Sequence, residues 1–150
     1  MSKYSQDAFI PKNPQKLVGN ANPFYRSSWE LTVMTLLDNH PNVIQWASES
    51  ITIPYINPLT GKRSIYIPDF FVLYRDKNGK ERAELIEVKP AKEAIAENAK
   101  SKRDKAALIV NTAKWAAAMT YCKKAGINFR ILTEDQIYIT KGKQLKKRIS

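Results

Sequence analysis

The residues most able to do chemistry in this sequence lie on two strand-like segments. Glu87 and Lys89 close the segment Glu84 to Lys89. Because side chains alternate across a strand, these two residues share one face and stand side by side at its end. The preceding segment, Ile65 to Val72, is apolar on both faces except at Asp69. A lone carboxylate in such a strand is costly to bury unless something binds it, so Asp69, Glu87 and Lys89 together indicate a binding or catalytic site.

The spacing of the two acids predicts a magnesium site. The turn at Asn78-Gly79 lies nearly midway between Asp69 and Glu87, so antiparallel pairing places the two carboxylates together. They offer the hard oxygen ligands that Mg²⁺ prefers, with positions left for water and phosphate, and Mn²⁺ can substitute. Lys89 would orient the attacking water or neutralise developing charge. This combination suits phosphodiester hydrolysis.

A third acid, Glu30, is predicted to join this site from a helix. Ser27 or Ser28 can cap a helix that runs to about Asn39. At 100° per residue, Glu30 falls near the middle of the apolar arc of this helix, and Arg26 points the same way. Glu30 therefore either pairs with Arg26 or reaches toward the strand carboxylates.

Each of these residues also has a simpler interpretation. Glu87 and Lys89 can form a solvated pair at a sheet edge, Asp69 can accept backbone hydrogen bonds at a bulge, and Glu30 can be an ordinary partner of Arg26. An acid-x-Lys triplet alone is common. The order of a helix acid, a strand Asp and a Glu-x-Lys strand end is what favours a catalytic site.

The elements around these residues predict a single α/β domain spanning residues 1–150. We expect strands at about Ser50 to Ile56, Ser64 to Tyr74 and Ala83 to Lys89, which form an antiparallel meander. A helical stretch from Ala91 to about Ala125 then leads to a strand at Asn128 to Leu132. A right-handed crossover makes this last strand parallel to its neighbour, so the sheet is mixed and flanked by helices.

The two ends of the chain are basic. Residues 1–25, rich in Pro, Asn and Lys, are expected to form an extended basic arm that wraps onto the domain, and residues 141–150 a basic tail. Residues 133–136, Thr-Glu-Asp-Gln, have the form of a capping box.

Composition narrows the function further. The chain carries 25 Lys and Arg against 14 Asp and Glu, a net charge of +11, which favours a polyanionic partner such as DNA. A merely soluble basic protein, or one that docks on an acidic partner, is the alternative. One cysteine, Cys122, and one histidine, His40, exclude a disulfide framework, a Cys-based zinc site and a Ser-His-Asp triad. No stretch is typical of a signal peptide or a membrane span, so we expect no membrane partner and a location in the cytoplasm.

The motifs resemble the PD-(D/E)XK nuclease superfamily. Pro68-Asp69 and Glu87-Val88-Lys89 match its signature, and Glu30 matches the helix acid that many members carry. A closer resemblance is to the head completion nucleases of T-even-type tailed bacteriophages. It is carried, in this order, by PKNP at 11–14, YRSSWE at 25–30, IPDF at 67–70, LIEVKP at 85–90, NTAKW at 111–115 and FRILTE at 129–134.

This resemblance implies a restriction-endonuclease-like fold, related to the endonuclease subunit of certain bacterial transposases. It implies catalytic roles for Glu30, Asp69, Glu87 and Lys89, with the three acids as metal ligands. Arg26, Lys12 and Lys114 are candidate DNA contacts, and Lys114 would touch a phosphate. The implied setting is virion assembly after DNA packaging, in the host cytoplasm or on the virion, with phage head or portal proteins as partners.

Two other functions remain open at this point. One is a basic, non-catalytic protein that seals the DNA-filled head at the portal, and the other is a structure-selective nuclease or resolvase. The oligomeric state is also open, because cutting both strands usually needs two active sites.

Overall fold

A mixed four-stranded sheet forms the centre of the fold. The computed structural model describes residues 7–95 and 98–134. The strands of the main sheet follow the order β3-β6-β7-β8 and comprise β3 (Val43–Ser48), β6 (Phe70–Arg75), β7 (Glu81–Val88) and β8 (Asn128–Leu132). Strands β3, β6 and β7 pair antiparallel, whereas β8 runs parallel to β7. The predicted α/β class, with its restriction-endonuclease-like mixed sheet and one parallel strand after a helical crossover, is confirmed.

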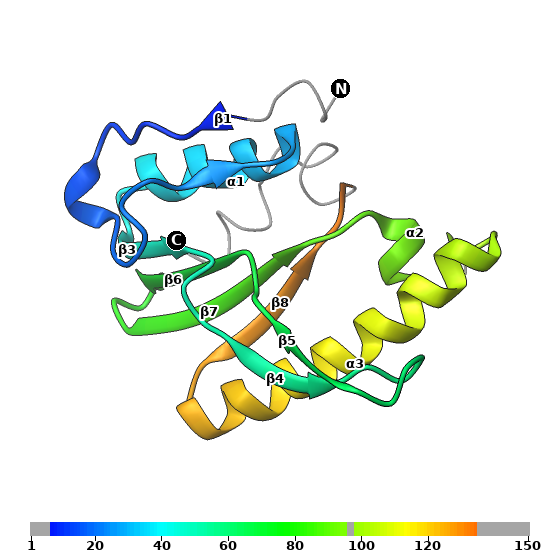
Figure 1. The fold of residues 1–150 in the computed structure, drawn as a ribbon. Helices are drawn as coiled ribbons and strands as arrows, with labels where there is room; N and C mark the ends of the chain where they lie inside the picture. The colour runs from blue at the N-terminus through cyan, green and yellow to red at the C-terminus, as the bar shows by residue number, and fades with distance from the viewer. Residues whose placement is uncertain (1–6, 96–97, 135–150) are drawn as a thin grey trace.

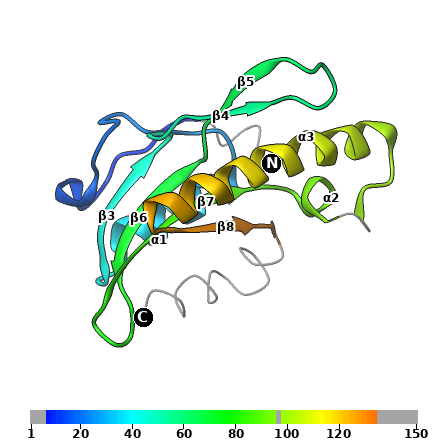
Figure 2. The same cartoon turned by 90° about the horizontal axis from the view of Figure 1, so that it is seen from below.

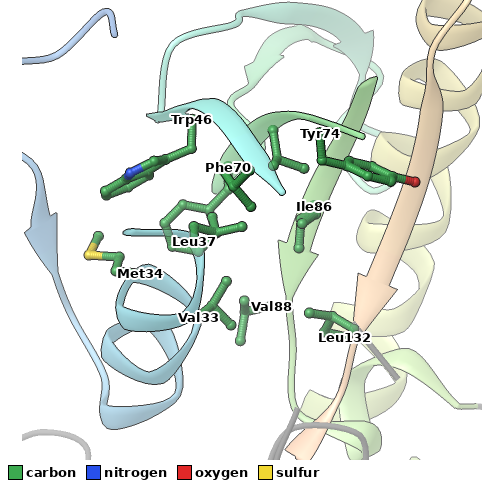
Figure 3. Packing of buried hydrophobic residues seen from close by; sticks show 11 residues of the cluster. Val33, Met34, Leu37, Trp46, Phe70, Tyr74, Ile86, Val88 and Leu132 are labelled. Carbon is green, nitrogen blue, oxygen red and sulfur yellow. The ribbon is translucent and has the colours of Figure 1, made fainter. Parts of the chain in front are cut away.

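Helices cover both faces of this sheet. Helix α1 (Ser28–Asn39) packs on one face and α3 (Lys102–Ala125) on the other, with the short α2 (Ala91–Ala94) next to the start of α3 (Figures 1 and 2). The core on the α1 side joins helix and strand residues, among them Leu37, Phe70 and Val88 (Figure 3). The core on the α3 side is built around Leu85 and Trp115. Alternate residues of β7 therefore face different cores, as its sequence predicts.

The helix that carries Glu30 begins where the sequence predicts. The N–H of Glu30 donates to Oγ of Ser27 at 3.1 Å, so Ser27 is the cap. The helix ends at Asn39, two residues before Pro41.

The N-terminal segment lies against α1 and β3. Its short strands β1 (Asp7–Ala8) and β2 (Phe24–Tyr25) pair antiparallel, and the 3-10 helix η2 (Pro14–Lys16) lies between them. Asp38, buried near the end of α1, accepts hydrogen bonds from the backbone N–H groups of residues 12 and 13 at 2.8 and 3.0 Å.

The antiparallel part of the main sheet differs from the predicted meander in its first strand. Strand β3, which the sequence analysis missed, occupies that position, and it carries a register shift between Val43 and Gln45. This irregularity breaks the two-residue alternation by which a strand is recognised in a sequence.

The predicted strand from Ser64 to Tyr74 is in fact two strands in two sheets. Its first half, β5 (Arg63–Tyr66), pairs with β4 (Ile53–Ile56) as a separate two-stranded hairpin, and its second half is β6. The break falls at Pro68, which has no N–H to donate to a continuous ladder. Asp69 lies immediately after this break.

The predicted helix from Ala91 to Ala125 is likewise interrupted. Helix α2 ends at Ala94, and α3 begins after Ser101, whose Oγ accepts from the N–H of Asp104 at 3.0 Å. Gly126 ends α3 with φ of 73°, as predicted. The basic tail and the second half of the capping-box motif, residues 135–136, lie outside the described residues. Among the helices in the described ranges, none is both long and apolar enough for a transmembrane span.

Candidate active site

The pairing of β6 with β7 places Asp69 next to the end of β7. Phe70 pairs with Ile86, so the residue before Phe70 comes level with Glu87. The N–H of Val88 donates to Oδ2 of Asp69 at 2.7 Å. Asp69 thus accepts the backbone hydrogen bond of its simpler interpretation and also lies beside the second carboxylate.

Glu87 is buried and held from two sides. The hydroxyl of Tyr66 donates to its Oε1 at 2.7 Å, and Nζ of Lys89 lies 3.4 Å from its Oε2. Only 4% of Glu87 is exposed, so its contact with Lys89 is not a solvated surface pair.

The ionised forms of Asp69 and Glu87 are unfavourable in this position. Burial raises the pKa of Asp69 well above its usual range, and the neighbouring charge of Glu87 raises it further. Burial also raises the pKa of Glu87, against the opposing effect of Lys89. Burial, together with the charge of Glu87, raises the pKa of Tyr66, so its hydroxyl stays protonated and able to donate. A bound cation would relieve the unfavourable charge of both carboxylates.

Glu30 occupies the first turn of α1 and faces the same region. Its Oε1 accepts the backbone N–H of Arg26 at 3.0 Å. Burial raises the pKa of Glu30, as does the charge of Glu49, while Lys89 lowers it. The charge of Glu30 in turn contributes to the raised pKa of Asp69. Glu30 therefore bonds to the backbone of Arg26, where its simpler interpretation expected an ion pair with the Arg26 side chain, and it also lies near the other acids.

Glu49, which the sequence analysis missed, connects the segment before α1 to Asp69. Its side chain, and not that of Glu30, forms the ion pair with Arg26, at 2.7 Å between Oε2 and Nη1. Its N–H donates to the carbonyl of Asp69 at 2.9 Å. With φ of 50°, Glu49 adopts a backbone conformation that is uncommon for residues with a side chain and often marks functional sites. An acid directly after a strand was its only signal in the sequence.

The candidate DNA contacts fall in different places. Lys114 reaches the site from α3, with Nζ 5.9 Å and 5.8 Å from the ring centroids of Tyr55 and Tyr66. Its charge lowers the pKa of Glu87, so it is a second cation beside this acid. Lys12 lies apart, because its backbone is bound to Asp38, eight residues along α1 from Glu30 or about 12 Å by helix rise.

Asp69 and Glu87 are the residues here with the chemistry to hold a divalent cation, and Glu30 is the third nearby acid. Within the described ranges, no three His, Cys, Asp or Glu side chains are close enough to form a complete metal cluster. Two carboxylates could hold an ion of the magnesium type, which commonly uses one or two carboxylates and fills its remaining positions with water and phosphate.

Comparison with known proteins identifies the family of this chain. The family described as TnsA-like endonuclease N terminal matches residues 40–134. The head completion nuclease of Enterobacteria phage T4 is 39% identical over 138 residues, which cover 85% of this chain and 89% of that protein. Residues 40–134 contain the hairpin β4–β5, Asp69 and the Glu87-Val88-Lys89 motif. The resemblance to the head completion nucleases is thereby confirmed, and the chain belongs to the TnsA-like endonuclease N-terminal family.

Proposed function

We propose that this protein is a Mg²⁺-dependent DNA endonuclease of the PD-(D/E)XK type that hydrolyses phosphodiester bonds. The observation that carries the proposal is the pair Asp69 and Glu87, brought together by neighbouring strands in a place where both are costly to ionise. Membership of an endonuclease family supports phosphodiesters as the substrate, and the net charge of +11 supports DNA binding.

Each side chain of the site has a role in this reaction. Asp69 and Glu87 would hold the metal, with Glu30 as the third acid nearby. When bound, the ion supplies Lewis acidity to the scissile phosphate and lowers the pKa of a coordinated water. Lys89, whose Nζ is 3.4 Å from Glu87 Oε2, orients the attacking water or neutralises charge on the phosphate.

The residues around the acids orient them or supply positive charge for DNA. Tyr66 fixes the orientation of Glu87 through its 2.7 Å hydrogen bond. Lys114 approaches from the opposite helix and contacts the phosphate backbone. Arg26, joined to Glu49 at the start of α1, provides a further DNA contact at the edge of the site.

The biological setting follows from the phage relative. Because that protein is named a head completion nuclease and aligns over most of both chains, we place this nuclease in virion assembly, after DNA packaging. It would act in the host cytoplasm, on or beside the filled head, with DNA as substrate and head or portal proteins as partners.

Plasmid cleavage tests the chemistry. Purified protein with supercoiled DNA and Mg²⁺ should produce nicked or linear product, Mn²⁺ should substitute, and EDTA should stop the reaction. Glu87→Gln should reduce the cleavage rate by at least about 100-fold, because a direct ligand of the catalytic ion is lost. The matched control is Glu81→Gln, at the exposed beginning of the same strand, which should cut like the wild type.

Two results would redirect the assignment. Wild-type protein that binds DNA but never cuts it would favour a structural protein that seals the filled head. Cleavage of branched or flapped DNA, with linear and supercoiled DNA left intact, would favour a structure-selective nuclease.

A further inference from the structure

The hairpin β4–β5 presents an apolar outer face that the proposed chemistry does not use. Ile56, Leu59 and Ile65 are 61%, 55% and 62% exposed. In the hairpin register Ile56 pairs with Arg63 and Pro54 with Ile65, so these four residues share the outer face. The hairpin lies outside the main sheet and extends alongside α3 (Figure 2).

The inner face anchors the hairpin to the body of the protein. Ile53 and Tyr66 are buried in the core that contains Trp115 of α3. Tyr66 also bonds to Glu87, and the chain passes from Tyr66 to Asp69 within three residues. The hairpin is therefore fixed relative to the active site.

The charged residues of the hairpin segment are all basic. Residues 50–68 contain no Asp or Glu, whereas Lys62 and Arg63 are both exposed. A hollow of about 290 Å³ on the hairpin is lined by Pro54, Tyr55, Ile56 and Arg63. Apolar side chains interspersed with cations, without any acid, form a surface that can bind DNA, whose grooves are bordered by phosphates and offer apolar contacts such as thymine methyl groups.

We propose that the β4–β5 hairpin is a DNA-contacting element that lies in a groove of the duplex next to the phosphate to be cut. This inference rests on the proposed nuclease function. A two-stranded ribbon has a width that the major groove admits. Ile56 and Ile65 would contact base surfaces, while Lys62 and Arg63 would bind the bordering phosphates. Continuity with the active site through Tyr66 favours DNA over a protein partner or a second copy of the chain.

The first test removes the apolar face. Ile56→Ala/Ile65→Ala should weaken binding of a fluorescent DNA duplex about tenfold, measured by anisotropy in EDTA so that no cleavage occurs. With Mg²⁺ it should raise the KM for cleavage and leave kcat within about twofold. The control Ile10→Ala/Ile109→Ala removes two exposed isoleucines elsewhere, 85% and 49% exposed, and should bind as the wild type does. Melting temperatures establish that all variants are folded.

The second test removes the charges. Lys62→Ala/Arg63→Ala should make the slope of log Kobs against log salt shallower by about 1.8, since each lost phosphate contact removes about 0.9. Lys77→Ala/Lys80→Ala removes the same charge from the turn before β7. That turn is separated from Glu87 by most of the strand, about 20 Å, so this control should leave the slope unchanged.

The outcomes separate this inference from the nuclease assignment. If the wild type cuts DNA and both hairpin variants bind and cut as it does, the inference is wrong and the nuclease assignment stands. If the wild type does not cut, the nuclease assignment fails, and the binding measurements in EDTA still decide whether the hairpin contacts DNA. Self-association that is lost in Ile56→Ala/Ile65→Ala, with DNA binding unchanged, would assign this face to a second copy and overturn the proposal.

Discussion

At the scale of single residues, the site lowers the stability of the fold because it holds two acids in a buried position. Asp69 and Glu87 lie together in a place where burial raises the pKa of each. A carboxyl whose pKa is higher in the folded state stabilises the fold most below its ordinary pKa. This contribution is lost as the pH rises from the ordinary value through the raised one. Without metal, the ionised acids therefore oppose folding at neutral pH.

Removal of one of these charges should stabilise the metal-free protein. Asp69→Asn can keep the hydrogen bond from Val88 through its amide oxygen, so we expect a gain of about 1 kcal/mol in the free energy of unfolding at pH 7 in EDTA. The gain should shrink as the pH falls through the raised pKa of Asp69 toward its ordinary range, because the wild-type carboxyl is then protonated. Urea unfolding across this pH range measures both effects. A variant less stable than the wild type at pH 7 in EDTA would show that the carboxylate supports the fold.

The hydroxyl of Tyr66 should matter for activity more than for stability. Tyr66→Phe removes the 2.7 Å hydrogen bond that orients Glu87, and loss of such a partner typically costs 10- to 100-fold in activity or metal affinity. We expect a decrease in kcat of about tenfold and weaker Mn²⁺ binding by calorimetry.

The fold offers a matched control for this change. The hydroxyl of Tyr74 donates to Oε2 of Glu84 at 2.9 Å, also in the interior. Tyr74→Phe therefore removes a similar buried bond to another acid of β7, from β6 instead of β5 and remote from Lys89. Equal losses of kcat in both variants would show that Tyr66 acts through the fold and not through Glu87.

At the scale of elements, the cap of α1 also holds a residue of the proposed site, Glu30. Ser27 caps this helix by accepting from Glu30, and Ser101 caps α3 by accepting from Asp104. Each Ser→Ala change should cost about 1 kcal/mol of stability. Only Ser27→Ala should also lower the cleavage rate, by several-fold, because it loosens the turn that carries Glu30. Chemical denaturation and plasmid cleavage measure the two effects, and a similar fall in cleavage for Ser101→Ala would contradict this role.

The sequence predicted those elements whose signals are local. The cap at Ser27, the end of α3 at Gly126 and the alternation of Glu87 and Lys89 on β7 each depend on one or two neighbouring residues. Strand β3 was missed because its register shift disturbs the alternation. The prediction of one long strand from Ser64 to Tyr74 was wrong. Strand propensity does not reveal that the chain leaves one sheet and enters another at Pro68.

The candidate site was predictable to a similar degree. The position of Asp69 beside Glu87 follows from one turn and a two-residue period. By contrast, the hydrogen bond from Tyr66 and the ion pair between Arg26 and Glu49 join elements that are remote in the sequence. Such contacts depend on how the hairpin and α1 pack on the sheet, and no spacing in the chain encodes them.

At the scale of the whole molecule, cations lie around the acidic site. Arg26, Lys89 and Lys114 lie at the site, and Lys62 and Arg63 lie on the hairpin joined to it. These groups come from the segment before α1, the residue after β7, α3 and the hairpin. The fold therefore collects around one place the positive charge that the sequence spreads along the chain. DNA binding that uses this region should therefore release several counterions.

The salt dependence of binding tests this distribution of charge. If the five cations each neutralise one phosphate, log Kobs should fall against log salt with a slope of about −4.5. Ion pairs of Arg26 with Glu49 and of Lys89 with Glu87 must open or share their cation, so the slope should be somewhat shallower than this limit. Anisotropy titrations from 50 to 300 mM NaCl, with EDTA present, measure it. A slope near zero would exclude the phosphate backbone as the main partner of these cations, whereas a slope well beyond −4.5 would require DNA contacts outside the active site and the hairpin.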